Sequence, residues 1–210
     1  MSIFKKKTVI LIPMKDPKKS KTRLEGSLSS IDRAYLSRSL FKRTLTVLQK
    51  IVKDYPNLYL ELAVISASVE ISEISKCHNT RFLVETGEES LNNATEIAKK
   101  WATLKNYESI CIFPADLANP DPLEIISFIK EADSDRFITI SPSSDLGTNA
   151  LHLSLPSSFE FKFGEKSFLK HLDSAERAGV KPKVLPLPSL KYDIDTSKDL
   201  RYLQDVDIEL

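Results

Sequence analysis

The residues Val9-Ile10-Leu11-Ile12-Pro13 form the first regular segment of the chain. Four apolar and mostly β-branched residues in a row favour a strand buried on both faces, as in a parallel sheet, over a helix. Pro13 ends the run, because proline has no N–H to donate to a neighbouring strand. A polar, lysine-rich stretch from Met14 to Gly26 follows. We therefore expect a buried strand whose carboxyl end leads into a basic loop.

Similar apolar runs alternate with amphipathic segments along the rest of the chain. Strands are predicted at 60–66, 81–84, 109–113, 137–140, 150–153 and 184–187, and helices at 29–53, 69–76, 91–104, 121–129, 166–179 and 197–203. Asp121-Pro122 is typical of a helix start, and Gly179 of a helix end. The alternation indicates an α/β fold with an open, mostly parallel sheet flanked by helices. We expect residues 1–210 to form a single domain.

The composition narrows the classes of partner. A formal net charge of +1 gives no general attraction to nucleic acid or to a membrane surface, so we expect neither as a partner. No apolar stretch approaches the ~18 residues of a membrane span, and the apolar run 9–12 is too short for a signal peptide. We therefore expect a cytoplasmic protein. Cys77 and Cys111 lie too far apart for a metal-ligand motif, and the apolar surroundings of Cys111 indicate a buried position.

The basic loop is the first candidate binding segment. Five of its nine residues from 15 to 23 are cations, namely Lys15, Lys18, Lys19, Lys21 and Arg23. Ligands of open α/β sheets bind beyond the carboxyl ends of the strands, and cations placed there could hold a triphosphate by charge-assisted hydrogen bonds. A solvated surface loop is the alternative interpretation. The chain has five glycines and neither a P-loop nor a dinucleotide-binding glycine motif, so side chains are expected to bind the phosphates.

Acidic residues form the second candidate. Asp116 follows the predicted strand 109–113, and Asp193 and Asp195 alternate along an extended segment, so the last two point to the same side. Carboxylates at such positions could hold Mg²⁺ against nucleotide phosphates. Turn formation and helix capping are the alternative roles for these acids.

Two polar segments complete the candidates. Gly147-Thr148-Asn149 offers an unhindered backbone and hydrogen-bonding side chains that suit a phosphate or a carboxylate, although the same residues are typical of a turn. Residues 163–168 open a predicted helix, whose free N–H groups and dipole attract anions. Simple capping of that helix is the alternative.

Taken in order, these segments resemble the 2-phospho-L-lactate guanylyltransferase family of coenzyme F-420 biosynthesis, which includes phosphoenolpyruvate and 3-phosphoglycerate guanylyltransferases. The similarity runs from about Val9 to Leu203. It is carried by the segments 12–15, 20–24, 115–117, 140–142, 147–151, 163–172 and 193–200. Each motif is modest by itself, whereas their common order and spacing are specific.

The resemblance implies a nucleotidyltransferase with a glycosyltransferase-A-like fold. It implies an Mg²⁺-dependent guanylyltransferase that uses GTP and a phosphorylated C3 acid and releases pyrophosphate. The matching nucleotide-binding residues are Pro13, Lys15, Lys21, Arg23, Asn92 and Asp116, with Asn92 at the base and with Lys15, Lys21, Arg23 and Asp116 also catalytic. The matching metal ligands are Asp116, Asp193 and Asp195, and the matching acceptor-binding residues are Thr148, Gly164 and Ser167.

The chain departs from the family pattern at three places, one of which is Ser143-Ser144-Asp145-Leu146, where the acceptor loop of the family is commonly more basic or richer in glycine. Ser90 stands where the family usually has a glycine before its Leu-Asn pair, and Ala118-Asn119-Pro120 follows Leu117 where the family usually has proline directly. A nucleotidyltransferase for the molybdenum cofactor or a sugar phosphate is the nearest alternative, but such enzymes commonly have a glycine-rich loop where this chain has Pro13-Met14-Lys15. A non-catalytic GTP-binding module is the alternative from another class.

The acceptor and the oligomeric state are open at this stage. Members of the family use 2-phospho-L-lactate, phosphoenolpyruvate or 3-phospho-D-glycerate, which differ by few atoms. We expect 2-phospho-L-lactate first, with 3-phospho-D-glycerate close behind. A homodimer is compatible with the sequence, because an amphipathic helix face serves a core or an interface equally well.

Overall fold

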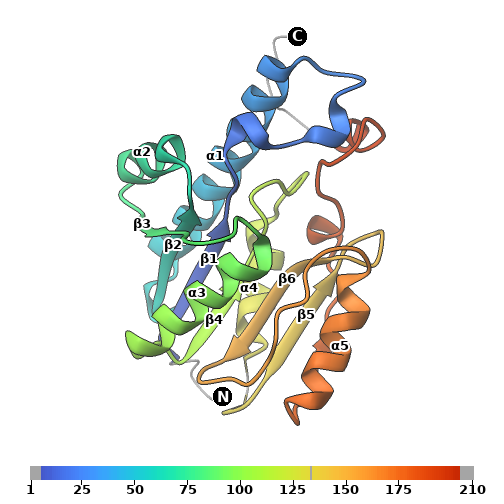
Figure 1. Ribbon diagram of the computed structural model, residues 1–210. Coiled ribbons are helices and arrows are strands. Elements are labelled where there is room, and N and C mark those ends of the chain that lie inside the picture. The colour runs from blue at the N-terminus through green and yellow to red at the C-terminus, as the bar shows by residue number, and fades with distance from the viewer. Residues whose placement is uncertain (1–5, 133, 204–210) are drawn as a thin grey trace.

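The computed structural model describes residues 6–132 and 134–203. Within these residues, seven strands form one sheet in the order β3-β2-β1-β4-β6-β5-β7 (Figure 1). The strands are β1 (Thr8–Pro13), β2 (Leu60–Ser66), β3 (Arg81–Val84), β4 (Ser109–Ile112), β5 (Ile138–Pro142), β6 (Thr148–Ser154) and β7 (Lys183–Val184). The predicted mostly parallel, open α/β sheet is confirmed.

The sheet contains one reversal of direction. β1 pairs in parallel with β2 and β4, and β5 pairs in parallel with β7, but β6 lies antiparallel between β4 and β5. The start of β6 therefore lies at the sheet edge where β1 and β4 end. This arrangement brings Thr148, the first residue of β6, to the edge that also carries the basic loop.

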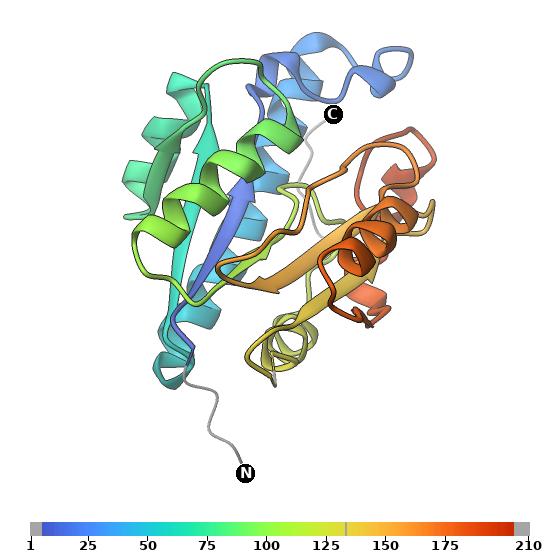
Figure 2. The same ribbon diagram turned by 60° about the horizontal axis from the view of Figure 1, so that its bottom comes forward.

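Helices cover both faces of the sheet (Figure 2). One face packs against α1 (Ser30–Asp54), α2 (Val69–Cys77) and α4 (Pro122–Lys130), and the other against α3 (Leu91–Leu104) and α5 (Ser167–Arg177). Strand β1 is apolar on both sides because Ile10 and Ile12 enter the first core whereas Val9 and Leu11 enter the second. Cys111 is fully buried in the first core, as its apolar surroundings predicted.

Local signals place the helix ends. The side chains of Ser29, Ser90 and Asp121 accept hydrogen bonds from the first-turn amides of α1, α3 and α4. Ser90 has φ −150°, which any residue adopts, so this serine caps α3 without backbone strain although the family that the sequence resembles usually has glycine there. Gly179 follows α5 with φ +69°, the left-handed conformation expected of a glycine after a helix.

Two predicted elements near the C-terminus are wrong in extent or type. The strand predicted at 184–187 is confined to Lys183–Val184, followed by one more bond from the Leu185 amide to the Ile140 carbonyl. Pro186 then supplies no N–H, so the pairing stops. The helix predicted at 197–203 is a 3₁₀ turn over Asp199–Tyr202. The Asp199 carboxylate accepts from the amides of the preceding residues 195 and 196, a local arrangement that competes with a longer helix.

The basic loop is folded rather than extended. It contains two short 3₁₀ turns, Pro17–Lys19 and Thr22–Leu24. Leu24 is fully buried in a third apolar cluster with Leu36 of α1, Ala118 and Ile194. This cluster joins the N-terminal loop to the segment 192–195, which lies far away in the sequence.

None of the helices in residues 6–132 and 134–203 has the length and apolar character needed to cross a membrane.

Candidate active site

A single cleft of about 730 Å³ opens at the sheet edge where β1 and β4 end. Its walls come from the basic loop, the start of α3, the segment after β4, the β5–β6 loop, the start of α5 and the segment around Asp193. Every residue to which the family resemblance assigns a role lines this cleft: Pro13, Lys15, Lys21, Arg23, Asn92, Asp116, Thr148, Gly164, Ser167, Asp193 and Asp195. The fold thus brings together residues that lie up to 182 positions apart, the separation of Pro13 and Asp195.

The three candidate metal carboxylates meet at one point of the cleft. Asp116, Asp193 and Asp195 each offer an oxygen, and these oxygens lie within 4.8 Å of one another. Backbone pairing holds the two segments in place, because the Ile194 amide donates to the Asp116 carbonyl over 3.1 Å and the Ala118 amide donates to the Tyr192 carbonyl over 2.9 Å. Hard carboxylate oxygens in such a group suit Mg²⁺.

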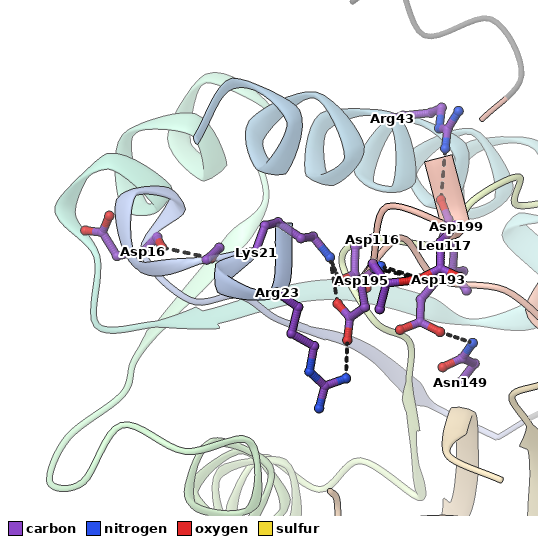
Figure 3. A network of polar contacts seen from close by, with 12 residues as sticks. Asp16, Lys21, Arg23, Arg43, Asp116, Leu117, Asn149, Asp193, Asp195 and Asp199 are labelled. Atoms are coloured by element: carbon purple, nitrogen blue, oxygen red, sulfur yellow. Dashed lines mark hydrogen bonds and ion pairs between the residues drawn. The ribbon is translucent and has the colours of Figure 1, made fainter. Parts of the chain in front are cut away.

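Lys21 is the buried cation of this cluster (Figure 3). Its side chain is only 4% exposed, and its ammonium contacts Asp116 and, at 3.1 Å, Asp195. Burial alone would lower the pKa of Lys21, but the two carboxylates outweigh it and the pKa is raised. Lys21 adopts φ +57°, a left-handed conformation that is uncommon for lysine. The loop therefore holds a permanent positive charge against the acids.

The surroundings of Asp193 raise the pKa of its carboxyl group. Burial, followed by the nearby charges of Asp116 and Asp195, raises its pKa to about 6. Asn149 partly opposes this shift by donating its side-chain amide to Asp193 over 3.2 Å. A bound cation would favour the ionised form of all three groups, because opposite charge lowers the pKa of a carboxyl. The donor set therefore fits a divalent ion.

Lys15 and Arg23 are two of the exposed cations of the cleft. The Arg23 side chain is 71% exposed and its guanidinium lies 3.5 Å from Asp195, so it extends along the cleft rather than into the core (Figure 3). Lys15 is exposed on the same loop, two residues after the end of β1. Both side chains can follow a polyphosphate, whereas Lys21 is fixed.

The three predicted acceptor-binding residues also come together. The Ser167 hydroxyl, at the start of α5, donates to the Thr148 hydroxyl oxygen at the start of β6 over 3.2 Å. Gly164 has φ +123°, which disfavours any side chain there. A Cβ on Gly147 would lie 2.6 Å from the Ser143 hydroxyl oxygen, so the β5–β6 loop also needs its glycine. With glycine at 147 and at 164, the hydroxyls of Thr148 and Ser167 form one polar wall of the cleft, the hydroxyl wall.

The amides at the start of α5 are mostly not free to bind an anion. The amide of Ser167 donates to the Gly164 carbonyl, that of Phe168 to Leu146 and that of Leu169 to Lys166. The anion attraction expected of this helix start therefore lacks three of its donors. A phosphate at this wall would depend on side-chain hydroxyls and nearby cations.

Asn92 lies in the cleft wall, but its side chain is used within the protein. Its amide oxygen accepts from the Phe163 amide over 2.7 Å, and its amide nitrogen donates to the Phe163 carbonyl over 3.2 Å. The arrangement ties the start of α3 to the segment that carries Gly164. This contact between residues 71 positions apart was not foreseen from the sequence, which assigned Asn92 to the nucleotide base.

Sequence reasoning also gave no role to two supporting residues. Arg43 of α1 donates to the carbonyls of Leu117 and Ala118, directly after Asp116 (Figure 3). His171 of α5 lies within hydrogen-bond distance of the Thr148 hydroxyl. A single cationic or imidazole side chain in an amphipathic helix carries no local signal of such a role, since its partner is distant in sequence.

Comparison with known proteins supplies an independent line of evidence. A family model described as guanylyl transferase CofC like matches residues 8–204. A 3-phospho-D-glycerate guanylyltransferase from Colwellia psychrerythraea is 36% identical over 197 residues, covering 94% of this chain and 91% of the relative. A phosphoenolpyruvate guanylyltransferase from Rubrobacter xylanophilus is 30% identical, covering 97% and 94%. A 2-phospho-L-lactate guanylyltransferase from Methanothermobacter thermautotrophicus is 28% identical, covering 92% and 82%.

Solved structures agree on the fold. A 4-diphosphocytidyl-2C-methyl-D-erythritol synthase from Anaerococcus prevotii superposes with a TM-score of 0.60 at 13% identity, covering 95% of each chain. At this identity the likeness concerns the fold alone. The glycosyltransferase-A-like α/β fold that the family resemblance implies is confirmed.

Proposed function

This chain belongs to the CofC-like guanylyl transferase family, and we propose that it transfers GMP from GTP to the phosphate of a small phosphorylated C3 acid. An oxygen of the acceptor phosphate forms a bond to the α-phosphorus of GTP, the bond from that phosphorus to the bridging oxygen breaks, and pyrophosphate leaves. The product is a guanylylated phospho-acid for coenzyme F-420 biosynthesis. We place the reaction in the cytoplasm, where GTP is available.

One observation carries this proposal. The charged cluster of Lys21 with Asp116, Asp193 and Asp195 and the hydroxyl wall of Thr148 and Ser167 line the same cleft. A nucleotide triphosphate and a phosphorylated acid are both polyanions, and their reaction needs one site with two anion-binding halves. Asn149 links the halves, because it follows Thr148 in β6 and donates to Asp193.

The residues act by positioning and by neutralising charge. The second pKa of a phosphate monoester is about 6, so the attacking oxygen is ionised at neutral pH and needs no general base. Lys15 and Arg23 are free to follow the β- and γ-phosphates, and Lys21 is fixed where charge develops on the leaving pyrophosphate. Preorganised charges of this kind stabilise a transition state without reorganising during the reaction.

Asp116, Asp193 and Asp195 would hold Mg²⁺, for which their oxygens have the required character and proximity. Such an ion, when bound, screens the negative charge of the phosphates and helps to align them. Lys21 already neutralises part of the acidic charge, so an ion held by these carboxylates would lie beside the ammonium group of Lys21. Arg43 keeps Asp116 in place through the neighbouring carbonyls.

Among the three acceptors, sequence identity favours 3-phospho-D-glycerate. The 3-phospho-D-glycerate enzyme is 36% identical to this chain, whereas a phosphoenolpyruvate enzyme and two 2-phospho-L-lactate enzymes are each 30% identical. We therefore propose 3-phospho-D-glycerate as the first acceptor to test, ahead of the 2-phospho-L-lactate that names the family.

A pyrophosphate-release assay tests the proposal. The enzyme is incubated with Mg²⁺ and GTP, ATP or CTP, in parallel with each of the three acceptors, and Asp116→Asn serves as the matched inactive control. Release that requires both GTP and one C3 acid supports the proposal and identifies the acceptor. A folded protein that binds GTP but releases no pyrophosphate with any acceptor contradicts the proposal and favours the non-catalytic module.

Sedimentation of the same preparation distinguishes a monomer from a homodimer.

A further inference from the structure

His171 has a partner on each ring nitrogen. The residue is fully buried on α5, and its ring packs edge-on against Phe163 with centroids 4.8 Å apart. Nε2 lies 3.0 Å from the backbone amide of Lys162, and Nδ1 lies 2.9 Å from the Thr148 hydroxyl oxygen. The imidazole thus joins the segment before Gly164 to the first residue of β6.

The Lys162 contact determines which nitrogen carries the proton. A backbone N–H can only donate, so Nε2 of His171 must accept and carries no hydrogen. The proton of the neutral ring is therefore on Nδ1. Burial, with a smaller contribution from the Lys170 charge, lowers the pKa of His171 to about 4, which keeps the ring neutral at physiological pH.

This tautomer leaves Thr148 with one available role. Nδ1–H of His171 donates to the Thr148 oxygen, and the Ser167 hydroxyl donates to the same oxygen over 3.2 Å. A hydroxyl oxygen accepts two hydrogen bonds, so both are taken. The remaining function of the Thr148 hydroxyl is to donate its own hydrogen, and the residue lines the cleft. An anion placed there meets a donor of fixed direction.

We propose that His171 is a positioning residue that holds the Thr148 hydroxyl as an obligatory hydrogen-bond donor to an anionic oxygen of the acceptor. The role assigned to it rests on the proposed function. His171 does not touch the acceptor; it acts through Thr148. The arrangement selects an acceptor oxygen that only accepts, such as that of a phosphate or carboxylate, over a neutral hydroxyl, because the preorganised donor does not have to turn.

Three variants test this role through the kinetic constants of the acceptor. His171→Gln can place its amide oxygen near Nε2 and keep the Lys162 contact while losing the donor to Thr148, and His171→Phe loses both. Both should raise the acceptor KM roughly tenfold, the effect of about one hydrogen bond, and leave the GTP KM unchanged. In a Thr148→Val background, His171→Gln should change the acceptor KM less than twofold, because the group it orients is gone.

Ser174→Ala is the matched control. Ser174 is buried one turn further along α5, and its hydroxyl donates to the Glu160 carbonyl and accepts from the Glu160 amide, so it fastens the same loop to the same helix without touching Thr148. This variant should lower the melting temperature yet leave the acceptor KM within twofold. An acceptor KM that rises equally in Ser174→Ala, or effects of His171→Gln and Thr148→Val that multiply, would overturn the proposal in favour of general loop packing.

A measurement that does not depend on activity decides the tautomer. The chain has three histidines, so a long-range ¹H–¹⁵N spectrum of the imidazoles, with His171→Gln for assignment, is readily interpreted. We expect the proton of His171 on Nδ1. A proton on Nε2 overturns the His171 proposal alone, whereas a wild-type enzyme that releases no pyrophosphate with any acceptor overturns the proposed function.

Discussion

Asp116 is the residue on which the charged half of the cleft depends. It contacts Lys21, its backbone carbonyl accepts from Ile194, and its oxygen belongs to the group of three carboxylates. Asp116→Asn keeps the size of the side chain but removes its charge. We expect turnover to fall at least about 100-fold, the usual effect of losing one preorganised electrostatic group.

Pyrophosphate release together with a thermal melt measures that effect. Asp121→Asn is the control, because Asp121 caps α4 and does not line the cleft. An Asp116→Asn enzyme with near-normal turnover at saturating Mg²⁺ would remove Asp116 from the metal site.

Lys21 is predicted to matter for folding as well as for activity. Lys21→Met leaves three close carboxylates without their buried ammonium, and removing one partner of a buried ion pair is strongly destabilising. We expect the melting temperature to fall by roughly 10 °C without divalent ions. Adding Mg²⁺ or Mn²⁺ should raise the melting temperature of the variant more than that of the wild type. Calorimetric melts with and without the ions measure both effects.

Arg23→Ala provides the contrast to Lys21→Met. The Arg23 side chain is 71% exposed, and its guanidinium comes no closer to Asp195 than 3.5 Å. Exposed ion pairs of this kind contribute little to stability. We expect the GTP KM to rise while the melting temperature stays within about 1 °C. A change confined to the melting temperature would make Arg23 a structural residue.

At the scale of elements, Asn92 of α3 has two possible roles: it either contacts the nucleotide base or ties α3 to the segment before α5. Because both polar atoms of its side chain engage the Phe163 backbone, Asn92→Ala should loosen the Gly164 segment and raise the acceptor KM several-fold, with a smaller change for GTP. Steady-state kinetics with each substrate varied in turn measure this. An effect on the GTP KM alone would instead support the contact between Asn92 and the nucleotide base that the family resemblance implies.

Elements held by local patterns were predictable, and those held by distant partners were not. The strand Leu60–Ser66 and the helix Leu91–Leu104 match the predicted bounds, because apolar periodicity and a capping serine lie within each segment. The antiparallel direction of β6 has no such signal, since an apolar run has the same pattern in either direction. Burial of Lys21, in a loop that looks solvated, depends on acids 95 and 174 positions away.

At the scale of the whole molecule, two buried histidines make stability depend on pH. Burial, with a smaller contribution from Lys6, lowers the pKa of His152 to about 3, and burial likewise lowers that of His171 to about 4. Both rings are neutral in the folded state, whereas the unfolded chain protonates them below about pH 6.5. The unfolded state therefore binds more protons in acid, and the stabilisation present above pH 6.5 is lost as the pH falls.

Urea unfolding at pH 7 and pH 5 measures this dependence. Each histidine should contribute about 2 kcal/mol to the loss of unfolding free energy between these values. His152→Gln and His171→Gln lower stability at both pH values, but each should reduce the difference between them by about that amount. Variants that keep the wild-type difference would show that carboxylates alone cause the acid sensitivity.

The reversed strand β6 has a consequence for how such an enzyme can diverge. Because β6 begins at the cleft, the hydroxyl wall, its glycines and its supporting imidazole all come from one uninterrupted stretch, residues 143–171, whereas the triphosphate half is assembled from dispersed loops. A change of acceptor can therefore arise, or be grafted from a relative, within a single cassette of the gene. Donor recognition would be kept as long as the exchanged stretch retains Asn149, which donates to Asp193.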